Sequence, residues 1–92
     1  MPRPRRRRRL GSAPKAVFYK PQGVPLRSLE TVEISLEEFE ALRLRYVEKR
    51  DQTECATQMQ TSQSTFQRIL SNTLEQIGGA IVNGKAIRIS KK

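Results

Sequence analysis

The chain has 92 residues, of which 36% are hydrophobic and 29% charged, and its formal net charge is +9. This length suits one small domain with a modest core. The chain has one cysteine and no histidine, which excludes an internal disulfide and a structural zinc site. No apolar run approaches the ~20 residues of a membrane span or follows the basic start as in a signal peptide, so we expect a cytoplasmic protein with no membrane partner.

The charges are unevenly spread along the sequence. Residues 3–9 contain six arginines, and residues 30–54 contain eight of the nine acidic residues. After this acidic middle, only Glu75 is acidic, whereas the end of the chain is again basic. Such a distribution favours a polyanionic partner, most commonly nucleic acid.

Residues 1–14 form an Arg-rich segment, which we expect to be a disordered arm because proline and like charges oppose packing. Its candidate DNA contacts are Arg5, Arg6, Arg7 and Arg8, which would lie in a minor groove or along phosphates. The alternative is a generic tail that increases solubility or binds RNA without sequence preference.

Residues 15–34 are expected to be extended or in turns. The run AVFYK (16–20) favours a strand but is ended by Pro21, and KPQGVP is typical of a turn. TVEIS (31–35) is a second short extended candidate. Both runs are too short for an independent sheet, so we expect them to pack along the helices, or to pair with each other or with another subunit.

The first predicted helix starts after Ser35. Ser35 and Glu38 have the spacing of a capping box, in which each side chain satisfies a free backbone N–H. The helix should end near Arg50. Its apolar face is predicted from helical spacing to consist of Leu36, Phe39, Leu42, Tyr46 and Val47.

Two further helices are predicted after it. Asp51 and Glu54 repeat the capping pattern and open a short second helix that reaches Met59. Ser62 caps a third helix, expected over residues 63–77. The apolar face of this third helix consists of Phe66, Ile69, Leu70, Thr73, Leu74 and Ile77.

The end of the third helix is weakened by Gly78 and Gly79, at about 1 kcal/mol each. We therefore end the helical domain at residue 82 and treat residues 83–92 as a basic C-terminal tail. The run VNG predicts either a late helix cap with Gly84 left-handed, which we favour, or an Asn-Gly hairpin turn joining AIV to KAIRI.

The second and third helices have the features of a helix-turn-helix, two helices joined by a turn of three or four residues. Ala56 is small where the helices would cross, and the turn needs a left-handed residue at Gln60, where glycine would be about 1 kcal/mol better. The side chains that can lock the corner are Cys55, Met59, Phe66 and Ile69. The predicted fold is thus mainly α, with a three-helix core that holds the helix-turn-helix within residues 35–82.

The outward face of the third helix favours DNA as the partner. Its N-terminal half carries amides, hydroxyls and one guanidinium, and no acid occurs before Glu75. In a major groove, Gln pairs with adenine and Arg with guanine, while hydroxyl groups donate to phosphate. The base-reading candidates are Gln63, Ser64, Gln67, Arg68 and Ser71, and the phosphate-binding candidates are Ser62 and Thr65. The alternative is a polar solvated face on a helical bundle.

Several stretches together resemble a known family: PRPRRRRR, YKPQGVPLRSLE, EEFEALRL, TFQRIL and VNGKAIRI. On these, nearly the whole chain resembles a small uncharacterised prokaryotic family predicted to bind DNA, and residues 36–75 resemble the helix-turn-helix of the sigma-factor region-four type. Members often carry Gly at the position of Gln60 and cysteines near residues 10–12. This chain reads LGS there, so no metal or redox role of such cysteines applies.

No constellation typical of an enzyme stands out, and we expect neither catalysis nor a cofactor or metal. Cys55 lacks a histidine to activate it, so we interpret it as a buried core thiol. The acidic residues Glu37, Glu38 and Glu40 are interpreted as a solvated helix face or a subunit contact.

The sequence thus predicts a sequence-specific DNA-binding protein, a transcriptional regulator whose partner is double-stranded DNA. One helix buries too little surface for tight operator binding, so we expect a homodimer on a two-fold site. The acidic first helix and residues 16–34 are the candidate interface. The alternatives are an RNA-binding protein that uses the arm, with few aromatic residues for stacking, and a protein-interaction module that uses the acidic helix.

Overall fold

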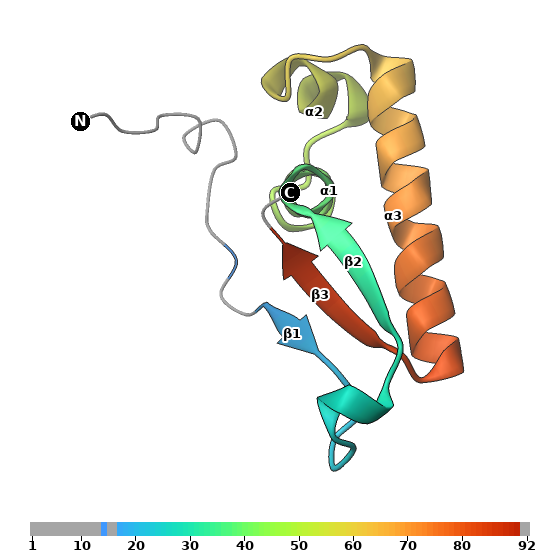
Figure 1. Cartoon of the computed structure of the whole chain (residues 1–92). Helices are drawn as coiled ribbons and strands as arrows, with labels where there is room; N and C mark the ends of the chain where they lie inside the picture. Colours follow the sequence, from blue (N-terminus) through green and yellow to red (C-terminus); the bar gives the residue numbers. More distant parts are fainter. Residues whose placement is uncertain (1–13, 15–16, 91–92) are drawn as a thin grey trace, which may run out of the picture.

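The computed structural model describes residues 14 and 17–90 (Figure 1). The elements are, in chain order, strand β1 (Phe18–Tyr19), the 3₁₀ turn η2 (Leu26–Ser28), strand β2 (Thr31–Ser35), helix α1 (Leu36–Leu42), the π-helical turn η3 (Arg43–Val47), helix α2 (Gln52–Gln58), helix α3 (Gln63–Asn83) and strand β3 (Ala86–Ser90). The mainly α class is confirmed, with a small sheet added. The predicted arm with Arg5 to Arg8 lies outside the described residues.

The three strands form one sheet in the order β1-β3-β2. Strand β3 is antiparallel to β1 and parallel to β2, with Ile34 opposite Ile89. The two early strands therefore pair with β3 and not with each other. Residues 86–90, which the sequence assigned to a basic C-terminal tail, form strand β3, and Ala86 and Ile89 are buried.

Helix α3 continues well past the expected end at residue 77, through Gly78 and Gly79. Ala80 is buried, and α3 contacts both β2 and β3. This tertiary packing outweighs the helix propensity lost at the two glycines. Gly84 has a φ of 69° and donates its N–H to the carbonyls of Ala80 and Ile81, so the helix-cap alternative is confirmed and the hairpin turn is wrong.

The hydrophobic core lies where the three helices meet. Its buried members are Ala41, Leu44, Cys55, Ala56, Phe66 and Leu70, with Leu42, Met59 and Ile69 packed against them. All four side chains predicted to lock the corner between the second and third helices belong to this set. The three-helix core is thus confirmed.

The buried face of α1 differs from the prediction. The Ser35–Glu38 capping box is present, but Glu40, Ala41 and Leu44 are buried, whereas Tyr46 and Val47 are 47% and 71% exposed. The π-helical turn η3 inserts a wider turn, in which the Glu48 N–H donates to the Arg43 carbonyl at 2.9 Å, and this shifts the face that meets the core. The interpretation of Glu40 as a solvated carboxylate is therefore wrong.

Candidate nucleic-acid interface

Helices α2 and α3 are joined by a tight turn over residues 59–62. The Asp51–Glu54 capping box starts α2, and Met59 is its C-cap. Gln60 follows with a φ of 60°, which is the left-handed conformation predicted for this position. The N–H of Thr61 donates to the Ala56 carbonyl at 3.0 Å, so the turn is also held to α2 by the backbone.

The contact between α2 and α3 is dry and close. Cys55 and Phe66 are 0% exposed and Ala56 is 3% exposed. The small Ala56 side chain lets the two helices approach, as the sequence predicted. Because this contact and the core hold α3 on one side, the orientation of its opposite side is fixed.

The exposed surface of α3 carries every base-reading residue predicted from the sequence. Gln63, Ser64, Gln67, Arg68 and Ser71 are all exposed. The buried side chains Phe66, Leu70 and Thr73 alternate with them at helical spacing. In Figure 1, the outer side of α3 faces away from the sheet and from the other two helices.

The two predicted phosphate-binding residues form a hydroxyl cluster at the start of α3. Ser62 Oγ accepts the Thr65 N–H at 3.1 Å, and the Ser62 hydroxyl donates to Thr65 Oγ1 at 2.9 Å. The Ser64 hydroxyl lies 3.4 Å from that of Ser62. Since the Ser62 proton is already engaged, Ser62 acts as a cap, and Ser64 and Thr65 are better placed to donate to a phosphate.

Thr53 on α2 joins this group, although no pattern in the sequence indicated a role for it. Its hydroxyl donates to the side-chain carbonyl of Gln63 at 3.4 Å, and both residues are exposed. The bond would direct the Gln63 amide group away from α2. Ten positions separate the two residues, so no local spacing in the sequence indicates the contact.

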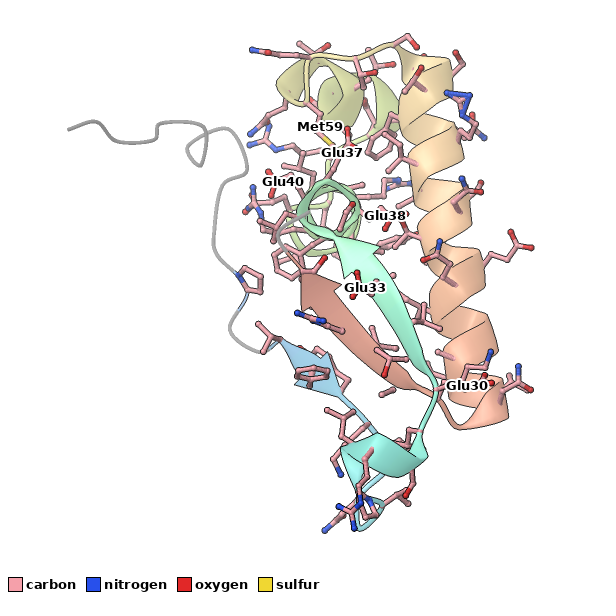
Figure 2. The ribbon with its side chains drawn as sticks, in the orientation of Figure 1. Glu30, Glu33, Glu37, Glu38, Glu40 and Met59 are labelled. Carbon is pink, nitrogen blue, oxygen red and sulfur yellow. The ribbon has the colours of Figure 1, made fainter. Side chains whose placement is uncertain are left out.

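Several glutamates before α2 lie along β2 and α1. Figure 2 labels Glu30, Glu33 and Glu37, which are exposed, and Glu38, which is half-buried. Lys85 pairs with Glu30 at 3.1 Å, and Arg88 pairs with Glu33 at 3.3 Å.

The first turn of α3, by contrast, contains no acidic residue. The positive end of the α3 dipole therefore remains free to attract an anion.

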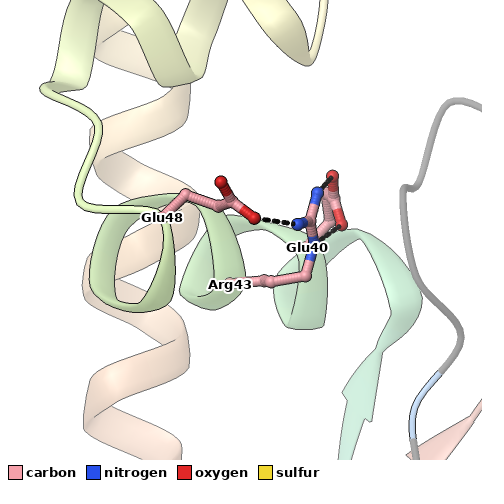
Figure 3. Close-up of polar contacts among 3 residues, drawn as sticks. All are labelled: Glu40, Arg43 and Glu48. Carbon is pink, nitrogen blue, oxygen red and sulfur yellow. Dashed lines mark hydrogen bonds and ion pairs between the residues drawn. The ribbon is translucent and has the colours of Figure 1, made fainter.

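Glu40 is held in the core by Arg43 (Figure 3). Arg43 donates from Nε to Glu40 Oε1 at 3.0 Å and from Nη2 to Glu40 Oε2 at 2.8 Å, while its Nη1 reaches Glu48 Oε2 at 2.9 Å. The hydrogen bonds to Glu40 are the main cause that raises the pKa of Arg43. The cluster is a structural ion pair and lies apart from the outer side of α3.

Cys55 is a buried thiol, as predicted. Its Sγ donates to the Arg50 carbonyl at 3.6 Å, and burial raises the pKa of the thiol. A neutral, inaccessible thiol is a poor nucleophile. Within residues 14 and 17–90, no group of three or more Cys, Asp or Glu side chains is arranged to hold a metal ion, and no helix described there is long and apolar enough to cross a membrane.

A family model described as "Protein of unknown function DUF134" matches residues 1–91. The chain belongs to the DUF134 family. This confirms the uncharacterised prokaryotic family that the sequence resembled. No solved structure matches this DUF134 chain.

Relatives of this DUF134 chain cover nearly all of it. It is 46% identical over 89 residues to the UPF0251 protein TTE1845 of Caldanaerobacter subterraneus subsp. tengcongensis, covering 97% of this chain and 75% of that protein. It is 43% identical over 90 residues to a UPF0251 protein of Pelotomaculum thermopropionicum, covering 98% and 68%. A UPF0251 protein of Dehalococcoides mccartyi is 46% identical over 89 residues, covering 97% and 76%.

Proposed function

We propose that this DUF134 protein is a sequence-specific DNA-binding protein, a transcriptional regulator in which α2 and α3 act as a helix-turn-helix. Helix α2 would cross the DNA backbone, and the N-terminal half of α3 would enter the major groove. The observation that carries the proposal is the exposed face of α3 over residues 63–71. It is polar and free of acid, and the core holds the opposite side of the helix.

The residue types on this face match the chemistry of a base-pair edge. Gln67 and Arg68 are exposed, and their side chains offer the bidentate groups that recognise adenine and guanine. Gln63 has its carbonyl tied to Thr53, which would present its amide N–H groups to an acceptor. Thr65 and the free N-terminus of α3 suit a phosphate.

The Arg-rich arm would add affinity without sequence preference. Its six arginines can neutralise about six phosphates, which predicts a slope of log K against log salt near −5 at about −0.9 per contact. Arg5 to Arg8 are the central members of this run. Affinity and specificity would therefore reside in two separate parts of the chain.

Fluorescence anisotropy of labelled duplex DNA at several salt concentrations tests both parts. A site selected from a random duplex pool is compared with an unrelated duplex, using wild type, a deletion of residues 1–9, and Gln67→Ala/Arg68→Ala. The matched control is Gln22→Ala/Arg27→Ala, since both residues are exposed and belong to the segment around η2, which lies at the other end of the molecule from the start of α3 (Figure 1). Circular dichroism verifies that each variant is folded.

We expect the deletion to flatten the salt slope and to leave the preference for the selected site. The double variant in α3 should lose about 1–3 kcal/mol of discrimination for each bidentate contact removed, whereas the control should bind like wild type. If the α3 variant keeps the site preference, α3 does not read DNA. If single-stranded RNA binds more tightly than every duplex, the protein is an RNA-binding protein that uses its arm.

A further inference from the structure

The outer side of α3 changes its chemistry half-way along the helix. The first half is polar, but the second half exposes Leu74, Ile81 and Val82, at 42%, 70% and 83%. Gly78 lies between them on the same side, at helical spacing. We call Leu74, Gly78, Ile81 and Val82 the apolar stripe.

The middle of the stripe is open. Apart from the neighbouring residues and nearby backbone of α3 itself, no atom of the described chain lies within 4 Å of the position that a Cβ would take at Gly78 or at the adjacent Gly79. Neither glycine has a positive φ, so the conformation of α3 does not require glycine at these positions. The missing side chains instead leave the backbone of α3 accessible to another helix.

We propose that the apolar stripe is the surface on which a second copy of this chain docks, with the two α3 helices antiparallel and crossing at Gly78–Gly79. A two-fold contact of this kind uses the same patch on both copies. Ile81 and Val82 of each copy then pack beside the glycines of the partner helix. This interface differs from α1 and residues 16–34, the candidates expected from the sequence.

The charges that flank the stripe favour a second copy in the antiparallel orientation. Glu75 lies at one end and Lys85 just beyond the other. Parallel helices would bring like charges together at both ends. Antiparallel helices that cross at Gly78–Gly79 place Glu75 within about 5 Å, along the helix axis, of Lys85 of the second copy, from the 1.5 Å rise per residue. Lys85 also pairs with Glu30 of its own chain, whose side chain is 79% exposed.

The stripe is small, which sets the expected strength of the dimer. The three apolar side chains of the stripe, with Gly78 and the adjacent Gly79, bury far less on each copy than the ~800 Å² per partner of a standard interface. The dimer should thus have a dissociation constant on the order of micromolar or weaker.

Sedimentation velocity without DNA, from about 1 µM to about 1 mM protein, tests the surface directly. We expect wild type to pass from monomer to dimer, and Ile81→Glu to raise the midpoint concentration at least about tenfold. Val47→Glu is the matched control, because Val47 is 71% exposed and Ile81 is 70% exposed. It should dimerise like wild type.

Oxidation of an introduced cysteine tests the crossing point independently. Gly78→Cys should form an intermolecular disulfide at least about tenfold faster than Thr57→Cys, because only a residue near the two-fold axis meets its counterpart within the ~4.4–6.8 Å between Cα atoms of a disulfide. Thr57 is exposed on α2. Cys55 is buried and does not compete.

Three results would overturn the proposal: a protein that stays monomeric over the whole range, equal disulfide rates at positions 57 and 78, or a dimer that Val47→Glu disrupts and Ile81→Glu leaves intact. The failure of the two proposals can be told apart. A dimer disrupted by Ile81→Glu that binds no duplex refutes DNA binding alone. A protein that binds its selected site but stays monomeric over the whole sedimentation range refutes the dimer alone.

Discussion

Replacing Glu40 by Gln should destabilise the protein strongly, although the two side chains have nearly the same shape. The Glu40 carboxylate is 1% exposed and accepts two hydrogen bonds from Arg43. Removing one member of a buried ion pair costs about 3–5 kcal/mol. Arg43 is 17% exposed and keeps Glu48 at 2.9 Å, so we expect a smaller loss of about 2–3 kcal/mol from the free energy of unfolding.

Urea unfolding at neutral pH, followed by circular dichroism, measures this loss. The control is Glu48→Gln, since Glu48 is 41% exposed and an exposed pair contributes at most about 1 kcal/mol, less in high salt. The double variant Glu40→Met/Arg43→Met removes both charges and should be more stable than Glu40→Gln. If Glu40→Gln lowers the free energy of unfolding no more than Glu48→Gln does, the buried ion pair does not hold α1 in the core. Our account of how α1 packs would then be refuted.

Three further changes test the backbone and the buried thiol. Gln60→Gly should raise the free energy of unfolding by about 0.5 kcal/mol, because glycine relieves the cost of φ 60° and loses part of that gain in unfolded-chain entropy; a lower urea midpoint would contradict this. Gly84→Ala should lower the free energy of unfolding by about 1 kcal/mol, because alanine is strained at the φ of 69° found at this position. An unchanged urea midpoint would show that the end of α3 adapts. Burial raises the pKa of Cys55 above its ordinary 9.0, so unfolding releases a proton above that pH. The stability of wild type relative to Cys55→Ala should therefore fall as the pH rises from 8 to 10, and a constant difference would argue against burial of the neutral thiol.

The starts of all three helices could be predicted because a cap depends on side chains within three positions. Ser35, Asp51 and Ser62 each accept a hydrogen bond from the backbone three residues later. The left-handed Gln60 followed from the same kind of local reasoning, applied to the short turn between two helices. The exposed face of α3 needed only helical periodicity.

What the sequence did not reveal depends on distant partners. Strand β3 has only five residues and is stabilised by β1 and β2 from the other end of the chain, so its own sequence also fits a tail. The burial of Glu40 depends on the π-helical turn after α1 and on the reach of Arg43. The bond between Thr53 and Gln63 exists only once α2 and α3 have packed.

The place of β3 in the sheet has a consequence for biosynthesis. Of the three strands, β3 emerges last from the ribosome, yet the other two pair only with it. Helices α1, α2 and α3 are neighbours in sequence and can pack while synthesis continues, whereas Phe18 must await Arg88, at the far end of the described chain. Contacts between such distant residues form slowly. A nascent chain would thus acquire its helical part first and close its sheet only once residues 86–90 have emerged, so that termination before residue 86 would remove the sheet and leave the helices.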